Sequence, residues 1–206
     1  MWSWLAVSLS GYICISAANR GERTHSLAAK VFTLLLLILI VLTEVQTQST
    51  AFWMVSGLAL FMFSDVLHVL TEKRVLPFIG FLMAQICYSK LFWLQLSGDI
   101  VWWLPALLLA TSIVAFLLLL PQLDSFLFPA TIMGIVLIQL SWASGELWLL
   151  EPTLGHSLGF IGCFILIFSG LMFVINSYRK PIRGANYWIS GSYFLAHALI
   201  VSSIIF

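Results

Sequence analysis

The chain has 206 residues, of which 62% are hydrophobic and only 8% are charged, and its formal net charge is +1. Soluble domains carry about 25% charged residues, so this composition excludes a soluble domain and predicts a membrane protein along the whole length. The near-neutral charge and the lack of a basic run exclude nucleic acid as an expected partner. We therefore expect a single transmembrane domain over residues 1–206.

Eight apolar segments follow one another along the chain, each close to the ~20 residues that a helix needs to cross a bilayer. Helices are the expected form, because backbone polar groups inside lipid must be satisfied within the segment. The first segment lacks a positively charged start and is therefore interpreted as a spanning helix, not as a cleaved signal peptide. The expected spans are 2–18, 27–43, 51–71, 77–96, 100–120, 128–150, 157–176 and 185–205. The predicted fold class is thus an all-α polytopic membrane protein with eight transmembrane helices.

The loops between these spans differ sharply in charge. The even-numbered loops hold no lysine or arginine, whereas the odd-numbered loops hold Arg20, Arg23, Lys73, Arg74, Arg179, Lys180 and Arg183. Loops rich in lysine and arginine stay in the cytoplasm. Both chain termini are therefore expected on the non-cytoplasmic side of the membrane.

The third span contains Asp65, and a charged side chain inside a bilayer is costly enough to mark a functional site. Its surroundings, GLALFMFSDVLHVL over 57–70, have a weak echo in GCFILIFSGLMFVI over 162–175, where Gly170 stands opposite Asp65. The matched pairs are Gly57/Gly162, Phe63/Phe168, Ser64/Ser169 and Val69/Val174, and the next spans add Ala84-Gln85 opposite Ala196-His197. The echo favours two parallel four-helix halves related by an axis along the membrane normal, with chance similarity between apolar helices as the alternative.

Several other polar residues are expected near the depth of Asp65, in the cytoplasmic half of the membrane, given the helical rise of ~1.5 Å per residue. They are Lys30, Gln85, Ser169 and Tyr193, with Tyr88 and His197 about one turn deeper. This layer predicts an internal polar pocket. The alternatives are interhelical hydrogen bonds that only hold the bundle together, a Lys30 that reaches the interface, and a His197 that is simply a satisfied core histidine.

The remaining candidates for chemistry give weaker signals. Glu146 lies near the outer end of the sixth span, roughly 15 Å or more from the Asp65 layer, and is expected at the outer interface. Cys14, Cys87 and Cys163 are expected to be buried apolar side chains, not disulfide or metal partners. The chain lacks the short motifs of serine hydrolases, nucleotide-binding loops and zinc proteases, so no cofactor or metal is expected.

Five stretches, in their order and spacing, resemble the YhhN family of eight-span membrane proteins, in particular its enterobacterial members. They are Lys30-Val31-Phe32-Thr33, Gly57 with Ser64-Asp65-Val66-Leu67, Gly80 to Tyr88, Trp142 to Trp148 and Tyr193 to Ile200. The family includes lysoplasmalogenases, so the resemblance implies a hydrolase that cleaves the vinyl-ether bond of a lysoplasmalogen. The expected products are a fatty aldehyde and glycerophosphocholine or glycerophosphoethanolamine. The resemblance also implies a bacterial inner membrane as the location.

Family members usually show an acid at the places of Asp65 and Gly170, a histidine at the place of Gln85 and a glutamine at the place of His197. This chain keeps Asp65, has a glycine for the second acid, and exchanges the histidine and glutamine between two spans. The exchange keeps one imidazole in the expected pocket.

The cleavage of a vinyl ether begins with a proton delivered to its β-carbon, and water then adds to the resulting oxocarbenium ion. Burial favours a protonated carboxyl group, so Asp65 is the candidate general acid and His197 the candidate for positioning or deprotonating the water. Lys30 is expected at the lipid phosphate; the other expected substrate-binding residues are Gln85, Tyr88, Ser169 and Tyr193. A contact between Lys30 and Asp65 would instead favour the carboxylate and oppose the acid role. A transporter of small molecules or lipids and a non-catalytic membrane protein are the alternative functions, and the oligomeric state stays open.

Overall fold

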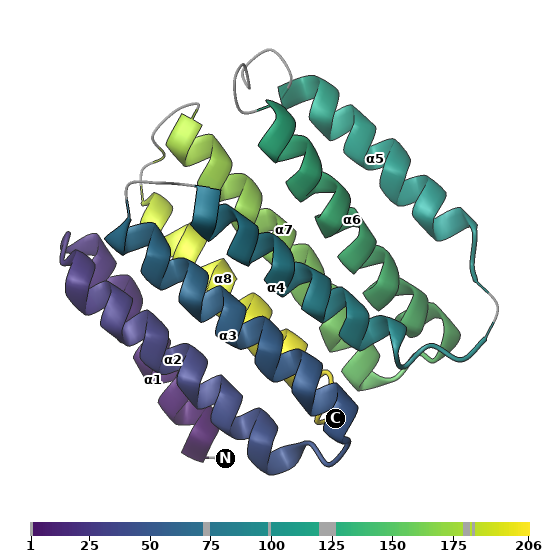
Figure 1. Ribbon diagram of the computed structural model, residues 1–206, viewed down its shortest axis with the longest axis horizontal. Helices are drawn as coiled ribbons and strands as arrows, with labels where there is room; N and C mark the ends of the chain where they lie inside the picture. The colour runs from purple at the N-terminus through teal and green to yellow at the C-terminus, as the bar shows by residue number, and fades with distance from the viewer. Residues whose placement is uncertain (1, 72–74, 99, 120–126, 179–181, 183) are drawn as a thin grey trace.

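A computed structural model describes the chain except residues 1, 72–74, 99, 120–126, 179–181 and 183 (Figure 1). The described residues form eight α-helices joined by short connections, and each coincides with one expected span to within four residues at either end. The helices are α1 (Trp2–Asn19), α2 (Arg23–Glu44), α3 (Gln48–Leu70), α4 (Val75–Trp93), α5 (Trp103–Leu119), α6 (Leu127–Leu150), α7 (Leu154–Tyr178) and α8 (Ala185–Ser202). The prediction of an all-helical protein is confirmed for the described part of the chain.

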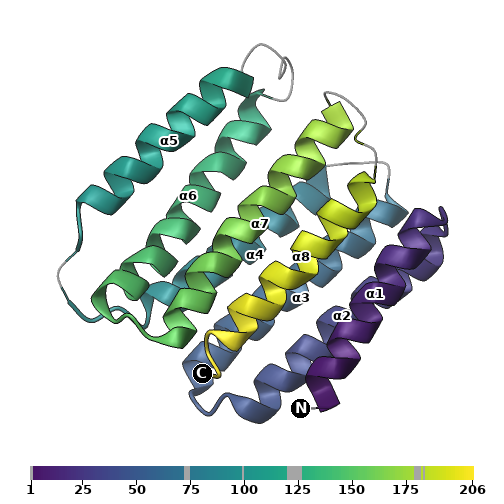
Figure 2. The same cartoon turned by 180° about the vertical axis from the view of Figure 1, so that it is seen from behind.

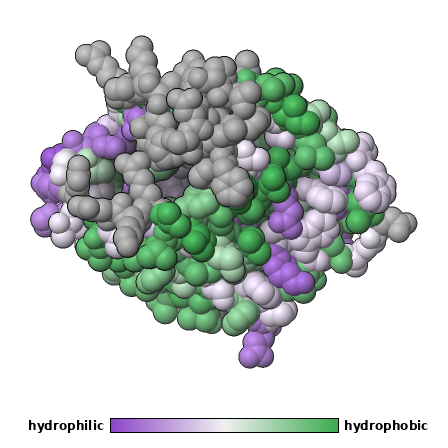
Figure 3. Space-filling model, turned by 45° about the horizontal axis from the view of Figure 1, so that its top comes forward, coloured by the Kyte–Doolittle hydropathy of each residue, from purple (hydrophilic) through white to green (hydrophobic). Residues whose placement is uncertain are grey.

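Within the described residues, five of the helices contain stretches that are long and apolar enough to cross a membrane. These stretches are Thr24–Glu44, Gln48–Leu70, Val75–Trp93, Thr131–Leu150 and Leu154–Phe173. Large apolar side chains, among them Leu39, Phe63 and Ile113, are more than half exposed on the outside of the bundle. Figure 3 shows such hydrophobic surface over much of one face of the molecule. This surface suits lipid and would be a liability in water.

The connections alternate between the two ends of the bundle. Helices α1, α3, α5 and α7 have their carboxyl ends at one end of the bundle, and both chain termini lie at the other (Figures 1 and 2). This arrangement is the one that the loop charges require. Arg20 lies in the described turn after α1. Lys73, Arg74, Arg179, Lys180 and Arg183 lie outside the described residues, and the side that faces the cytoplasm stays a prediction.

The helices pack in an order that places α3, α4, α7 and α8 at the centre. Hairpin partners α3 and α4 lie against each other, as do α7 and α8, while α2 packs on α3 and α6 packs on both α4 and α7. Helix α1 lies across α2 and α8, and α5 packs on the outer side of α6 at the edge of the bundle (Figures 1 and 2). The fully buried side chains come from the four central helices and from the inner faces of α2 and α6, which contribute Leu37 and Leu140 among others.

Candidate functional site

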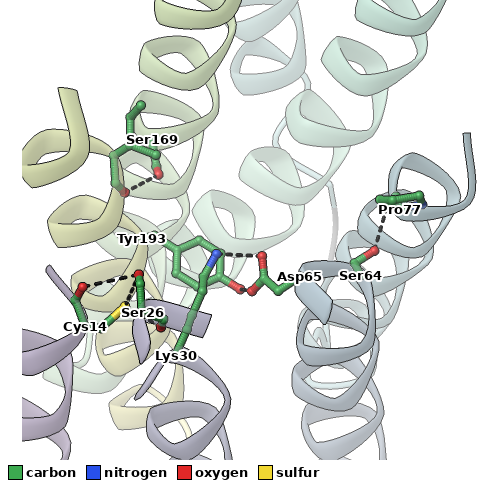
Figure 4. A network of polar contacts seen from close by, with 9 residues as sticks. Cys14, Ser26, Lys30, Ser64, Asp65, Pro77, Ser169 and Tyr193 are labelled. Carbon is green, nitrogen blue, oxygen red and sulfur yellow. Dashed lines mark hydrogen bonds and ion pairs between the residues drawn. The ribbon is translucent and has the colours of Figure 1, made fainter. Parts of the chain in front are cut away.

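Asp65 lies on α3, five residues before the helix ends, and its side chain points into the bundle with only 5% of its surface exposed. Two side chains from other helices converge on its carboxylate (Figure 4). Lys30 Nζ, from α2, lies 2.5 Å from Oδ1, and the Tyr193 hydroxyl, from α8, donates a hydrogen bond of 2.8 Å to Oδ2. The Lys30 ammonium also lies 4.1 Å from the centre of the Tyr193 ring, within cation–π range. Three helices thus meet at one carboxylate.

The contact between Lys30 and Asp65 changes the roles expected for both residues. A neighbouring ammonium group favours the ionised carboxylate, so it opposes the expectation that Asp65 alone stores a proton. The Lys30 ammonium also points inward to Asp65 and is not turned out toward a lipid phosphate. A buried carboxylate needs such a partner, because an uncompensated charge in low dielectric costs several kcal/mol. The two residues therefore act as one pair.

His197 lies on α8 one turn after Tyr193 and is fully buried. Its Nδ1 atom lies 2.9 Å from the hydroxyl oxygen of Tyr88, on α4. Its ring also contacts the Tyr193 ring edge to face, with the centres 4.3 Å apart. Among the described residues, no hydrogen-bond partner lies within reach of His197 Nε2. One nitrogen of the imidazole is thus held in place while the other is buried without a protein partner.

Phe61 joins the two parts of this site, and the sequence did not single it out. Its ring lies 4.5 Å from the ring of His197, 5.4 Å from that of Tyr88 and 6.1 Å from that of Tyr193, measured between centres. Phe61 precedes Asp65 by four residues and therefore shares its face of α3. That spacing was the signal that could have identified it.

Gln85 and Ser169 were expected at the same depth, but they contact other groups. Gln85 Nε2 donates to the sulfur of Met133, on α6, at 3.2 Å, and Gln85 Oε1 has no hydrogen-bond partner among the described residues. The Ser169 hydroxyl donates to the carbonyl oxygen of Ile189 at 2.9 Å. Five of the seven expected site residues are therefore brought together, and these two are not. Within the described residues, no group of three or more His, Cys, Asp or Glu side chains could hold a metal ion.

Glu146 lies near the end of α6 as expected, and its side chain is buried in the protein, with only 1% of the residue exposed. One carboxylate oxygen accepts a hydrogen bond from the backbone N–H of Val101, in the connection before α5, and the other accepts one of 2.9 Å from Trp142 Nε1. Trp142 also packs edge to face on Trp93, the last residue of α4. Glu146 thus fastens the connection between α4 and α5 to α6.

We expect Glu146→Gln to destabilise the protein without affecting chemistry at Asp65. The glutamine amide NH₂ would replace one of the two acceptors and face an N–H donor, and a buried donor left unpaired costs about 1–3 kcal/mol. Thermal unfolding of the purified protein, followed by tryptophan fluorescence, should show a lower midpoint than for the exposed-site control Glu151→Gln. Equal midpoints for the two variants would contradict the fastening role.

Comparison with known proteins places the chain in a family. The YhhN family profile matches residues 25–204. Proteins named "Uncharacterized membrane protein YhhN" from Escherichia coli O6:H1, Escherichia coli O157:H7 and Shigella flexneri are each 29% identical over 206 residues, covering 99% of this chain and 99% of each relative. No solved structure matches the chain. Because the profile covers most of the chain and the relatives align from end to end, the protein belongs to the YhhN family of membrane proteins.

Proposed function

We propose that the protein is an intramembrane lipid hydrolase that cleaves the vinyl-ether bond of a lysoplasmalogen, an alkenyl-glycerophosphocholine or alkenyl-glycerophosphoethanolamine. The products would be a fatty aldehyde and the glycerophospho-base. The observation that carries the proposal is the buried Lys30–Asp65 pair with Tyr193 on its second oxygen, beside an imidazole with one unpartnered nitrogen. An ion pair and an imidazole inside apolar helices are costly to maintain for structure alone.

The pair is suited to the first step, in which a proton is added to the β-carbon of the vinyl ether. Lys30 Nζ donates a hydrogen bond to Asp65 Oδ1, and in the proposed step the pair as a unit gives up this proton. The substrate then becomes an oxocarbenium ion and Lys30 becomes a neutral amine. The cation beside the Asp65 carboxylate is thus the Lys30 ammonium before the step and the oxocarbenium ion after it. No net charge is created in the low-dielectric interior, so the carboxylate stabilises the cation as it forms. This scheme needs one carboxylate and does not depend on an acid at position 170.

The second step adds water to the oxocarbenium carbon. His197 Nε2 accepts a proton from that water, while Tyr88 holds the other nitrogen of the ring. The water oxygen bonds to the carbon and forms a hemiacetal, which breaks its bond to the glycerol oxygen as its own hydroxyl proton passes to that oxygen. The proton on His197 returns to Lys30, which restores the pair. One water molecule is consumed for each bond cleaved.

The location of the site suits a substrate that comes from one leaflet. Asp65 lies near the carboxyl end of α3, where α1 and α7 also end (Figure 1), and the loop charges predict that this end of the bundle faces the cytoplasm. The proposal therefore includes eight transmembrane helices, both termini on the far side, and a lysolipid that enters from the cytoplasmic leaflet of a bacterial inner membrane.

The test is the incubation of the purified protein with a 1-alkenyl lysophospholipid in D₂O, followed by reduction and mass spectrometry of the products. Protonation of the β-carbon would place one deuterium on carbon 2 of the trapped alcohol. A 1-acyl lysophospholipid of equal chain length is the control, because an esterase would release a fatty acid from it. Absence of aldehyde from a panel of chain lengths and both head groups would reject the proposed function.

A transporter is the second candidate, because parallel internal repeats occur in transporters. The polar contacts at Asp65 lie in one half of the bundle and do not form a path with Glu146, which is bonded to Val101 and Trp142. A flux of lysolipid or of its soluble products across liposomes, without any chemical change, would favour the transporter over the hydrolase.

A further inference from the structure

The hairpins α3–α4 and α7–α8 each contain a hydrogen bond from a serine hydroxyl to a backbone carbonyl, and the two bonds are equivalent. The Ser64 hydroxyl donates to the carbonyl oxygen of Pro77 at 2.5 Å, and the Ser169 hydroxyl donates to that of Ile189 at 2.9 Å. Ser64 and Ser169 stand opposite each other in the internal alignment, and the two acceptors each lie seven residues before the matched alanines of α4 and α8. Each half of the chain therefore makes this bond at the same point.

The closest helix contacts also match between the two hairpins. A β-carbon at Gly57 would lie 2.5 Å from the ring of Tyr88 and 3.4 Å from the carbonyl oxygen of Ala84. A β-carbon at Gly162 would lie 2.8 Å from Ile200 and 3.1 Å from the carbonyl oxygen of Ala196. Glycine is needed at both places for the same close approach. Since α3 and α7 run in the same direction (Figure 1), an approximate two-fold rotation along the bundle relates the hairpins.

The contact between His68 and Phe173 locates the axis of this rotation. These residues occupy the same position in the two halves of the alignment, and their ring centres lie 5.7 Å apart. Residues related by a two-fold rotation can touch only beside its axis. Asp65 and Gly170 each precede these residues by three positions, so they lie on the same faces of α3 and α7. Asp65 and Gly170 therefore face each other across the axis.

The two faces differ in how they are filled. On the α3 side, Lys30 and Tyr193 occupy both oxygens of the carboxylate. On the α7 side, apart from the helix's own backbone and the residues adjoining Gly170, no atom of the described side chains lies within 4 Å of where a β-carbon of Gly170 would sit. The neighbouring side chains on that face are Leu166 and Phe173, which are apolar. His197, on α8, has one ring nitrogen without a hydrogen-bond partner among the described residues.

We propose that the room in front of Gly170 binds the first carbons of the lipid's hydrocarbon chain, so that the absence of a side chain at Gly170 lets the chain lie there. This inference rests on the proposed function for the identity of the lipid. The apolar face of α7 takes the chain, and the polar face of α3 takes the vinyl ether and the glycerol. The substrate then lies along the axis with its reacting carbon between the two faces.

The test uses a photoreactive analogue, a 1-alkyl lysophospholipid with a diazirine on the chain near the ether oxygen. A saturated ether cannot undergo vinyl-ether cleavage, so labelling reports binding alone. We expect the wild-type protein to be labelled within the segment 163–173 of α7. In Gly170→Leu, the yield of labelled protein should be roughly tenfold lower than in the wild type. Gly170→Ala tests tolerance of a small side chain, and Gly191→Leu, a helical glycine that faces Ile15 on α1, is the matched control. Equal labelling of wild type and Gly170→Leu would overturn the proposal.

Kinetics with 8- and 16-carbon alkenyl chains give the second arm. We expect Gly170→Leu to raise KM roughly tenfold for both chain lengths, because the two chains share the carbons that lie at Gly170, whereas Gly191→Leu changes neither KM. If the wild type releases no aldehyde but is labelled at α7, the hydrolase proposal fails and the chain site stands. If the wild type releases aldehyde and Gly170→Leu keeps KM for both chains within about twofold of the wild-type values, the chain site fails and the hydrolase stands.

Discussion

Asp65→Asn should reduce the release of aldehyde from a lysoplasmalogen at least ~100-fold, the usual scale for loss of a group that handles a proton in the transition state. Asparagine keeps the size of the side chain and an acceptor for the Tyr193 hydroxyl, but it cannot share a proton with Lys30 or carry the charge that stabilises an oxocarbenium ion. The measurement is aldehyde formation by purified protein, with the exposed-site variant Glu44→Gln as the control. Activity of Asp65→Asn within about twofold of wild type would reject the role of the pair.

The same substitution should also weaken the fold, because it leaves the Lys30 ammonium without its partner. Loss of one partner of a buried ion pair costs about 3–5 kcal/mol. Here we expect roughly 1–3 kcal/mol, since the Lys30 side chain is 25% exposed and can turn toward the interface. The double variant Lys30→Met, Asp65→Asn removes both charges and should recover the unfolding midpoint while staying inactive. Recovery of activity together with stability would show that the pair holds the bundle and takes no part in chemistry.

The positions of the helices were predictable from the sequence because a span is a long apolar run between breaks. The rotation of each helix about its own axis, which decides the face that is buried, was not predictable. Phe61 and Phe63 are two residues apart on α3, yet Phe61 is buried against four other rings and Phe63 faces outward. In a soluble helix, polarity would distinguish these two faces. A helix in lipid is apolar on both, so the sequence carries no such signal.

The same lack of a signal for helix rotation explains which site residues were predicted correctly and which were not. Helical rise gives depth, and it correctly placed Lys30 and Tyr193 at the level of Asp65. Gln85 and Ser169 also lie near this level, but their faces of α4 and α7 direct them to Met133 and to Ile189. The burial of Glu146 was not predictable for another reason: its partner is a backbone N–H in a connection far away in sequence. A pattern of side chains in the sequence does not indicate which backbone N–H will act as the donor.

His197→Gln should lower kcat roughly 100-fold and leave KM within about threefold, because it removes the proposed proton acceptor without changing the apolar walls. Glutamine retains a polar end that can pair with the Tyr88 hydroxyl, so the α4–α8 contact is preserved. The matched variant is Gln85→Asn, which alters the amide on the other half of the bundle and should keep activity within about threefold. Equal losses for the two variants would indicate that buried amides and imidazoles act only through packing.

The mechanism also requires one particular tautomer of His197. Nε2 can accept a proton from water only if Nδ1 carries the hydrogen and donates it to the Tyr88 oxygen. We expect ¹⁵N spectra of histidine-labelled protein to show this Nδ1–H form, with the signal assigned by its absence in His197→Gln. Tyr88→Phe removes the acceptor for that hydrogen, so the Nε2–H form should become populated and kcat should fall about tenfold. An Nε2–H imidazole in the wild type would make Nε2 a donor to the water and would exclude it as the base.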